Sequence, residues 1–375
     1  TIGIISLGKK DPGVYEITGS ANDDLQAYSA GFKGVFDFSG DDVGGTYKEY
    51  EDELSNSLQD SFCLFDEVEF HTSCKAISTI NSHPNEEVEV SEKVYEVLED
   101  ALTKTHEDKN YSIYAAPIYS YWDWLFSLQS ELQASNDPKN STLSKDLLDG
   151  LVKYCNEPYV KLELNGNNKA KLTVDEEYLT FRTENEVTAP FVSLNVLKNA
   201  YRLQMLADAF NEKGFTNGYL LYDDGLYVSL KDHNDPIYTL YDLKGSKYAK
   251  YAAVQIGKPS CAVNSKRFVF GNPDYIPFYE LSDGTKRNSI INLKTGYGDE
   301  NYVSTSLFGK DNDIVEAAFK SNYLSTLDVT EAKTFATNEY CSFTVYEENK
   351  NAYVSGKLIE FTTLNTELGY NLIKL

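Results

Sequence analysis

The chain has 375 residues, 41% of them hydrophobic and 13% aromatic, which is enough to bury a large core as one elaborate domain or two closely packed ones. Its formal net charge of −24 disfavours nucleic acids and anionic membranes as partners, because both bind best to basic surfaces. No window approaches the roughly eighteen consecutive apolar residues that a bilayer-spanning helix needs, so we expect no membrane-spanning segment.

The first 31 residues are weakly patterned, and we predict an N-terminal arm or a peripheral strand there. The main domain is expected to run from Phe32 to residue 375, with the boundary between two intertwined subdomains left open. Residues 35–38 predict a strand, and residues 47–65 predict an acidic amphipathic helix. Apolar residues at steps of four, four and three mark the buried face of that helix: Leu54, Leu58, Phe62 and Phe65.

Ser91 is placed to cap a helix over residues 92–105, because its hydroxyl can accept hydrogen bonds from the free N–H groups of the first turn. Ser144 is predicted to cap the next helix, over residues 145–155, in the same way. Two alternating runs on either side of an Asn-Gly turn predict a β-hairpin over residues 160–174.

A helix is predicted over residues 193–214 with Gly214 just beyond its end, followed by a second hairpin over residues 219–230. Shorter strands are expected over residues 237–243, 252–256, 267–270, 341–346, 357–362 and 370–375. Residues 288–328 predict a strand, a tight turn, a second strand and a helix that Asx residues near Asp313 open, which together are typical of a βαβ-like piece. The alternation of hairpins and long helices predicts an α+β fold, with layered sheets and helices in two interlocked halves.

The cysteines leave the redox compartment open. They are Cys63, Cys74, Cys155, Cys261 and Cys341. No two are separated by only two residues, which argues against a zinc ribbon or a thioredoxin-type pair. A bridge between Cys63 and Cys74 is one alternative, but we predict buried free thiols, since unpaired cysteine behaves as a small hydrophobic residue.

Four stretches stand in a recognisable order. Each resembles a segment of the same known protein family. Asn288–Tyr297 is similar to the segment of that family that reads His-x-x-Asp-Pro-x-Thr-Gly. Phe65–Asn81 is similar to the family's helix end that is followed by Thr-Ile-Asn. Val88–Ser91 with its following helix, and the aromatic Tyr111–Leu128, match two further segments. Together they resemble the flavin transferase (ApbE) family, and the resemblance covers residues 32–328. The two tryptophans of the aromatic stretch, at 122 and 124, are predicted to be core residues.

The resemblance implies an ApbE-like fold, related to the T-fold, that binds FAD between two α/β layers. It also implies Mg²⁺-dependent transfer of the FMN half of FAD to a Thr or Ser hydroxyl of a client protein, or its hydrolysis. Breaking a pyrophosphate linkage requires metal ions held by hard oxygen ligands. The family supplies an Asp and, one turn later, a Thr, and these positions correspond to Glu316 and Lys320. Lysine has no acceptor and repels a cation, so we expect no metal here, and the vestigial positions predict an ordinary i,i+4 surface ion pair.

A second motif, Asp-x-Gly-x-x-Ala-Lys-Gly-Tyr, lies beside the flavin phosphates in the family and has also changed. It corresponds to Ser193–Tyr201, in which Tyr201 alone keeps the family residue. Asn195 stands at the first Gly position and adds a side chain where a phosphate would pass. Together with Asn199 and Ala200 it predicts a polar, partly filled cleft.

Two other motifs are reduced. Ser265 keeps its place in the family's Thr-Ser-Gly while both neighbours differ, and the family's Asp-Pro is Asn292-Leu293. A tight turn would require Thr295-Gly296 in any case. The resemblance therefore implies no catalytic residue and these vestigial cofactor-binding residues: Ser265, Thr295, Gly296 and Tyr201.

We expect a catalytically degenerate ApbE-like protein, a non-enzymatic binding or scaffolding homologue without FAD or Mg²⁺. The alternative is a divergent Mg²⁺-dependent FAD:protein FMN transferase or FAD-binding protein, which would keep both cofactors. A protein partner is left open. The chain contains no P-loop, serine-hydrolase or zinc-protease motif. Family members commonly lie outside the cytoplasmic membrane, and the missing initiator Met suggests that a leader or a tag was removed. The resemblance therefore implies an extracytoplasmic, membrane-anchored protein, with a cytoplasmic one as the alternative.

Overall fold

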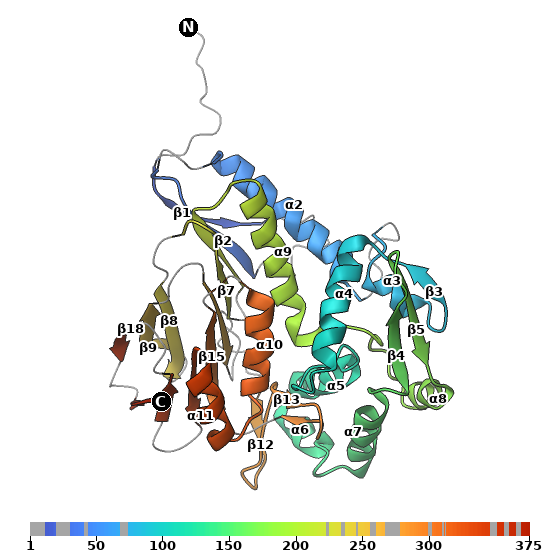
Figure 1. Cartoon of the computed structure of the whole chain (residues 1–375). Helices are drawn as coiled ribbons and strands as arrows, with labels where there is room; N and C mark the ends of the chain where they lie inside the picture. Colours follow the sequence, from blue (N-terminus) through green and yellow to red (C-terminus); the bar gives the residue numbers. More distant parts are fainter. Residues whose placement is uncertain are drawn as a thin grey trace.

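A nine-stranded sheet forms the larger half of the protein (Figure 1). The structure is a computed structural model and describes residues 12–19, 31–40, 44–67, 74–222, 225–233, 237–244, 247–255, 260–266, 278–298, 302–309, 311, 313–345, 351–355, 360–364 and 369–375. In spatial order the nine strands are β1 (Val14–Thr18), β2 (Phe32–Asp37), β6 (Gly218–Tyr222), β7 (Leu226–Ser229), β10 (Cys261–Lys266), β15 (Tyr302–Gly309), β16 (Cys341–Val345), β17 (Asn351–Val354) and β19 (Asn371–Lys374). Neighbours are antiparallel except β17 and β19, which are parallel.

Four helices accompany this sheet. They are α2 (Tyr47–Phe65), α9 (Lys198–Glu212), α10 (Ile314–Leu324) and α11 (Val329–Asn338). The predicted bounds of α2 are confirmed. Thr46 and Glu49 form a reciprocal capping box, which explains why the helix begins at Tyr47. Its predicted apolar face is buried throughout, and each fully buried leucine or phenylalanine contributes about 1.5–3 kcal/mol.

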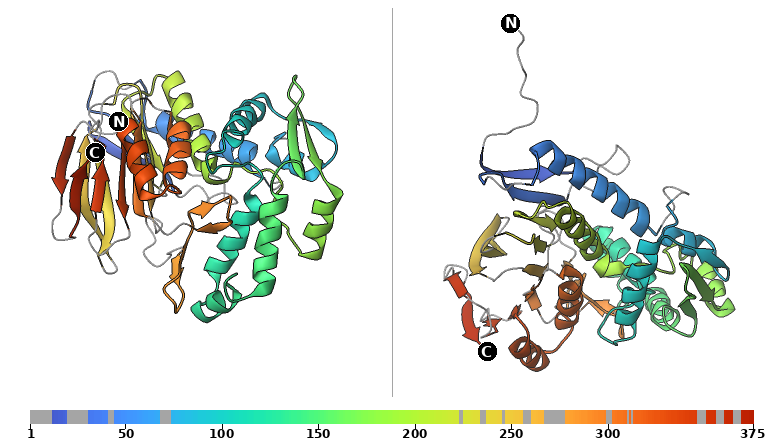
Figure 2. Two further views of the ribbon diagram at one scale, coloured as in Figure 1. Left: turned by 60° about the horizontal axis from the view of Figure 1, so that its bottom comes forward. Right: turned by 45° about the horizontal axis from the view of Figure 1, so that its top comes forward.

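The smaller half consists mainly of helices beside a short sheet (Figure 2). Its helices are α3 (Ile77–Ser82), α4 (Glu92–Thr105), α5 (Ala116–Ser127), α6 (Ser130–Asn136), α7 (Thr142–Tyr154) and α8 (Glu176–Glu184), and its strands are β3 (Glu87–Glu89), β4 (Val160–Leu164) and β5 (Lys169–Val174). The buried apolar residues of both halves form one continuous cluster. The predicted α+β class with two interlocked halves is therefore confirmed.

Short elements complete the fold. They are the 3₁₀ turn η1 (Asn195–Leu197), the sheet β8 (Ile237–Lys244), β9 (Lys247–Gln255) and β18 (Glu360–Leu364), and the pairs β11 (Phe278–Glu280) with β12 (Lys286–Asn288) and β13 (Ile291–Asn292) with β14 (Tyr297–Gly298). Both predicted hairpins are present, as is the Ser91 cap of α4, whose hydroxyl accepts from the N–H of Val94 at 3.2 Å. The strand predicted over residues 267–270 lies outside the described residues.

Two local predictions are wrong. Ser141, and not Ser144, caps α7, so that helix begins a turn earlier than expected. The piece over residues 288–328 is also not a βαβ unit. The two helices α10 and α11 connect β15 to β16, and these strands are antiparallel neighbours. Two helices in succession return the chain to the same end of the sheet, whereas a parallel crossover would have to return it to the opposite end.

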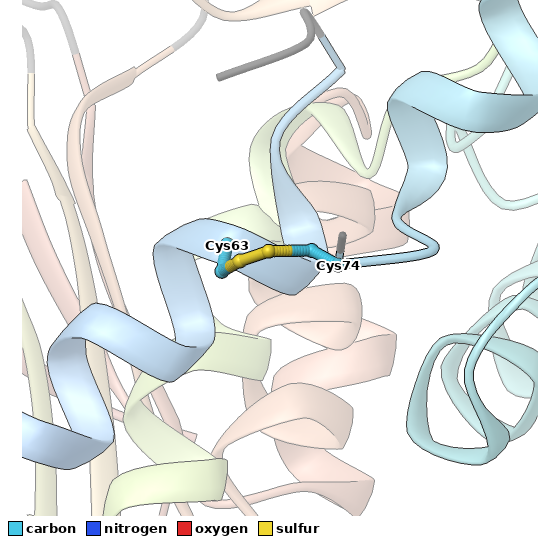
Figure 3. Close-up of a disulfide and its surroundings, with 2 residues drawn as sticks. All are labelled: Cys63 and Cys74. Carbon is cyan, nitrogen blue, oxygen red and sulfur yellow. A yellow bond between two sulfur atoms is a disulfide. The ribbon is translucent and has the colours of Figure 1, made fainter. Parts of the chain in front are cut away.

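The prediction of free thiols at Cys63 and Cys74 is also wrong. The structure joins them in a disulfide with a Cα–Cα distance of 5.8 Å (Figure 3). Cys63 lies in the last turn of α2, and the chain comes back to it before α3 begins. The other three cysteines, Cys155, Cys261 and Cys341, are buried thiols as predicted. Within the described ranges, no helix combines the length and apolar character that spanning a membrane requires.

Candidate functional site

The opening of α9 corresponds to the motif expected beside a flavin phosphate. Asn195 has a φ of +48°, in the left-handed region where glycine and asparagine are tolerated best. Asparagine therefore keeps a backbone conformation that suits glycine. The side chain of Asn195 also forms two hydrogen bonds. Its Nδ2 donates to the backbone carbonyl oxygens of Ser112 at 2.7 Å and of Ser193 at 3.2 Å. The amide thus links the turn to the backbone of Ser112 and Ser193.

A carboxylate from the end of α2 lies against the same opening. The Ser193 hydroxyl donates to Oε1 of Glu67 at 2.8 Å, and the ammonium of Lys198, the first residue of α9, donates to Oε2. A helix N-terminus attracts anions, and Glu67 places a carboxylate beside Ser193 and Lys198 near the start of α9. The chain itself thus provides the anion at the start of α9.

A second ion pair lies one turn further along α9. Arg202 donates to Oδ1 of Asp66 at 2.6 Å, and its guanidinium lies 4.0 Å from the centre of the Phe62 ring. Burial raises the pKa of Asp66 although Arg202 acts in the opposite direction, and burial lowers the pKa of Arg202. Both charges therefore carry a desolvation cost and hold α2 and α9 together only as a pair.

Tyr201 begins a chain of polar contacts that leads to Glu316 and Lys320. Its hydroxyl donates to Oδ2 of Asp100 on α4 at 2.5 Å, and burial raises its pKa. Oδ1 of Asp100 lies 2.9 Å from Nζ of Lys104, which in turn lies 3.3 Å from Oε2 of Glu316 on α10. Lys320 completes the chain, with Nζ 3.6 Å from Oε1 of Glu316. The structure thus brings Tyr201, Glu316 and Lys320 into one network.

The side chains around Glu316 do not fit a divalent metal ion. Each of its two carboxylate oxygens faces a different ammonium group, that of Lys320 or that of Lys104. A metal would have to displace both, and neither lysine can act as a ligand while it is charged. In the part of the chain that the structure describes, no group of three or more His, Cys, Asp or Glu side chains could hold a metal ion. The predicted Glu316–Lys320 ion pair is present, as part of a larger network.

A hollow of about 430 Å³ lies next to this network. Its charged lining residues are Glu96, Asp100, Asp311, Asp313, Lys93 and Lys104. Four carboxylates against two ammonium groups give it an acidic character, which disfavours a pyrophosphate. The donor set therefore fits FAD poorly as well.

The Thr295-Gly296 turn is held by packing. Gly296 has a φ of +78°, and a Cβ atom there would come within 2.6 Å of Val152, so glycine is required. Its carbonyl accepts from Nε1 of Trp122 at 2.6 Å, while Thr295 is exposed. The core prediction is right for Trp122 and wrong for Trp124, which is 47% exposed.

Asn110 connects this turn to α10. The side-chain amide of Asn110 donates from Nδ2 to the Ile291 carbonyl at 2.9 Å, and its Oδ1 accepts from the N–H of Leu293 at 2.8 Å. The backbone carbonyl of Asn110 accepts from Nδ2 of Asn322 on α10 at 2.6 Å. Ser265 on β10 also meets α10, with its Oγ 3.3 Å from that of Ser321. Ser265 thus contacts the helix that carries Glu316, and the turn is linked to that helix through Asn110. Among the contacts of the described residues, neither touches Tyr201.

The sequence did not indicate that four further residues belong to this site: Glu67, Asp100, Lys104 and Asn110. The i,i+4 spacing of Asp100 and Lys104 on α4 could have indicated their mutual ion pair. Their contacts with α9 and α10 join residues far apart in the chain, and no local pattern indicates them.

No model of a known protein family matches the chain, and no curated protein sequence matches it. Solved structures do match. The ApbE protein from Thermotoga maritima has a TM-score of 0.65 at 14% identity, over 92% of this chain and 97% of that one. The flavin transferase ApbE from Vibrio cholerae has a TM-score of 0.63 at 12% identity, over 92% and 98%. The apo form of the Pseudomonas stutzeri flavinyl transferase ApbE has a TM-score of 0.61 at 13% identity, over 96% and 98%. The chain therefore has the ApbE fold.

Proposed function

We propose that this protein is a non-catalytic binding or scaffolding protein built on the ApbE fold, without FAD or Mg²⁺ as cofactor. The observation that carries the proposal is Glu67, whose carboxylate lies against Ser193 and Lys198 at the opening of α9. A flavin phosphate would have to displace this built-in anion and the Asn195 amide beside it. Both are held by contacts that the chain makes with itself.

The proposal is tested by adding FAD and Mg²⁺ to the purified protein. We expect no flavin absorbance after purification, no quenching of flavin fluorescence on titration, and no heat of specific binding. Incubation with a Thr-bearing acceptor should leave the acceptor mass unchanged. Micromolar FAD binding, or a covalent FMN mass shift, would contradict the proposal and would identify a divergent flavin transferase.

Restoring the metal ligands should not restore transfer. The variant Glu316→Asp with Lys320→Thr regains the family ligands, but Lys104 and the filled opening of α9 remain. Residues that act as a unit are strongly non-additive, so repairing one part leaves the barrier nearly unchanged. Robust labelling of a Thr-bearing acceptor by this variant would show that the rest of the site is intact.

We also propose that the protein works outside the cytoplasmic membrane. The Cys63–Cys74 disulfide supports this location, because such bridges persist mainly in oxidising compartments. Fractionation of the source cells, followed by thiol alkylation without reductant, tests both points. Recovery in the cytoplasmic fraction with five alkylated cysteines would contradict the proposal.

A further inference from the structure

The Cys63–Cys74 disulfide joins the end of α2 to the chain just before α3 (Figure 3). Asp66 and Glu67, whose carboxylates contact α9, lie between the two bridged cysteines. Both cysteine side chains are half-buried, so a dissolved reductant can reach the bridge. An accessible disulfide therefore constrains the stretch of chain that carries both carboxylates.

The contact between this stretch and α9 is costly to maintain. The side chain of Arg202 is 6% exposed and that of its partner Asp66 is 15% exposed, so both charges give up most of their hydration. The Nε atom of Arg202 is buried, and it has no hydrogen-bond partner in the described part of the chain. A buried donor without an acceptor destabilises the arrangement that buries it. The disulfide offsets this cost, because it restricts the other conformations that the bridged chain could adopt.

One hydroxyl connects Glu67 to the backbone at the opening of α9. The Ser193 hydroxyl donates to Oε1 of Glu67 at 2.8 Å, and the same oxygen accepts from the backbone N–H of Asn195 at 2.9 Å. Without Glu67 the hydroxyl loses the acceptor that orients it, and the Asn195 amide loses a fixed partner. Exchange of the Asn195 amide hydrogen therefore reports whether Glu67 is in place.

We infer that the disulfide is a redox-dependent clamp that keeps Glu67 at the opening of α9, and that its reduction releases Glu67 from its partners there. This inference rests on the proposed function, in which Glu67 stands at that opening, and it adds a means of regulation. Reduction needs two electrons and two protons, which a dithiol supplies. One thiolate of the dithiol forms a mixed disulfide and the other displaces it, so both cysteines become thiols while the dithiol becomes a disulfide.

The test measures amide hydrogen exchange in the oxidised protein and in the protein reduced with dithiothreitol. We expect the Asn195 amide to exchange at least about tenfold faster after reduction, because local opening is no longer opposed by the bridge. Leu148, a buried residue of α7 in the smaller half, is the internal control. Its amide should change by less than about twofold, which separates local release from a general loss of stability.

Two substitutions assign the effect to Glu67. In Glu67→Ala the bridge remains but the carboxylate is gone, so the Asn195 amide should exchange fast already in the oxidised protein, and reduction should add less than about twofold. Asp60→Ala removes an exposed carboxylate from the same end of α2 and should keep the full response to reduction. The double variant Cys63→Ser with Cys74→Ser, measured without reductant, should match the reduced wild type.

Three results would overturn the clamp. They are equal Asn195 exchange in the oxidised and reduced wild type, an undiminished response to reduction in Glu67→Ala, and acceleration of the Leu148 amide as large as that of Asn195. The outcome is separable from that of the proposed function, because these measurements contain no FAD. Binding of FAD by the oxidised wild type would contradict the proposed function alone, and unchanged exchange would contradict the clamp alone.

Discussion

Replacement of Asn195 tests how the opening of α9 is built, because two substitutions separate its two contributions. Both Asn195→Gly and Asn195→Ala remove the hydrogen bonds from Nδ2 to the carbonyls of Ser112 and Ser193. Only alanine also places an unsuitable side chain at a φ of +48°. Glycine accepts that conformation without strain.

The expected magnitudes follow from these contacts. Loss of a hydrogen bond costs about 0.5–1.5 kcal/mol, so the loss of both bonds in Asn195→Gly should lower the free energy of unfolding by about 1–3 kcal/mol. Alanine in the left-handed region adds about 1–2 kcal/mol of strain. The lower entropy of alanine in the unfolded chain offsets about 0.4–1 kcal/mol of this. We therefore expect Asn195→Ala to be less stable than Asn195→Gly by about 1 kcal/mol.

Urea unfolding monitored by circular dichroism measures this difference, as a shift in the midpoint at unchanged m-value. Asn199 is the matched control, because it lies in the first turn of α9 with ordinary helical geometry. Asn199→Gly should be less stable than Asn199→Ala by about 0.5–1 kcal/mol, because glycine is the poorer helix former. The order of the glycine and alanine variants is therefore opposite to that at position 195. An Asn195→Ala protein as stable as Asn195→Gly, or more so, would refute the strained turn.

Two further predictions concern stability elsewhere. Burial alone would raise the pKa of Asp137, but hydrogen bonds from Arg287 and Tyr279 hold it below its ordinary value. Its contribution to stability is therefore present above about pH 4 and is lost as the pH falls through the lowered pKa, so unfolding free energies measured from pH 5 to pH 2 should fall less steeply in Asp137→Asn. A slope equal to that of the wild type would contradict the role of this pair. Replacing Cys63 and Cys74 together by serine should cost about 3 kcal/mol, because the bridge closes a loop with a sequence separation of 11. An unchanged urea midpoint would show that the bridge does not constrain the unfolded chain.

Local signals determined the parts of the fold that could be predicted well. The bounds of α2 and α4 agree with the structure because their caps and apolar spacing depend on residues within four positions of one another. The two predicted hairpins depend on equally local turn chemistry. Where two hydroxyls competed for one helix start, as Ser141 and Ser144 do, the local signal was ambiguous and the prediction chose the wrong residue.

Tertiary packing decided what lies around the site. From the sequence by itself we predicted, through the resemblance, that Lys320 would disfavour a metal ion and that Asn195 would disfavour a phosphate. It did not indicate that Lys104 of α4 reaches Glu316, or that Glu67 reaches the start of α9, since the partners are distant in the chain. A charged side chain can pair with any of the many opposite charges of this acidic protein. The packing of α4, α9 and α10 against one another brings particular pairs within reach, and burial then makes those pairs necessary.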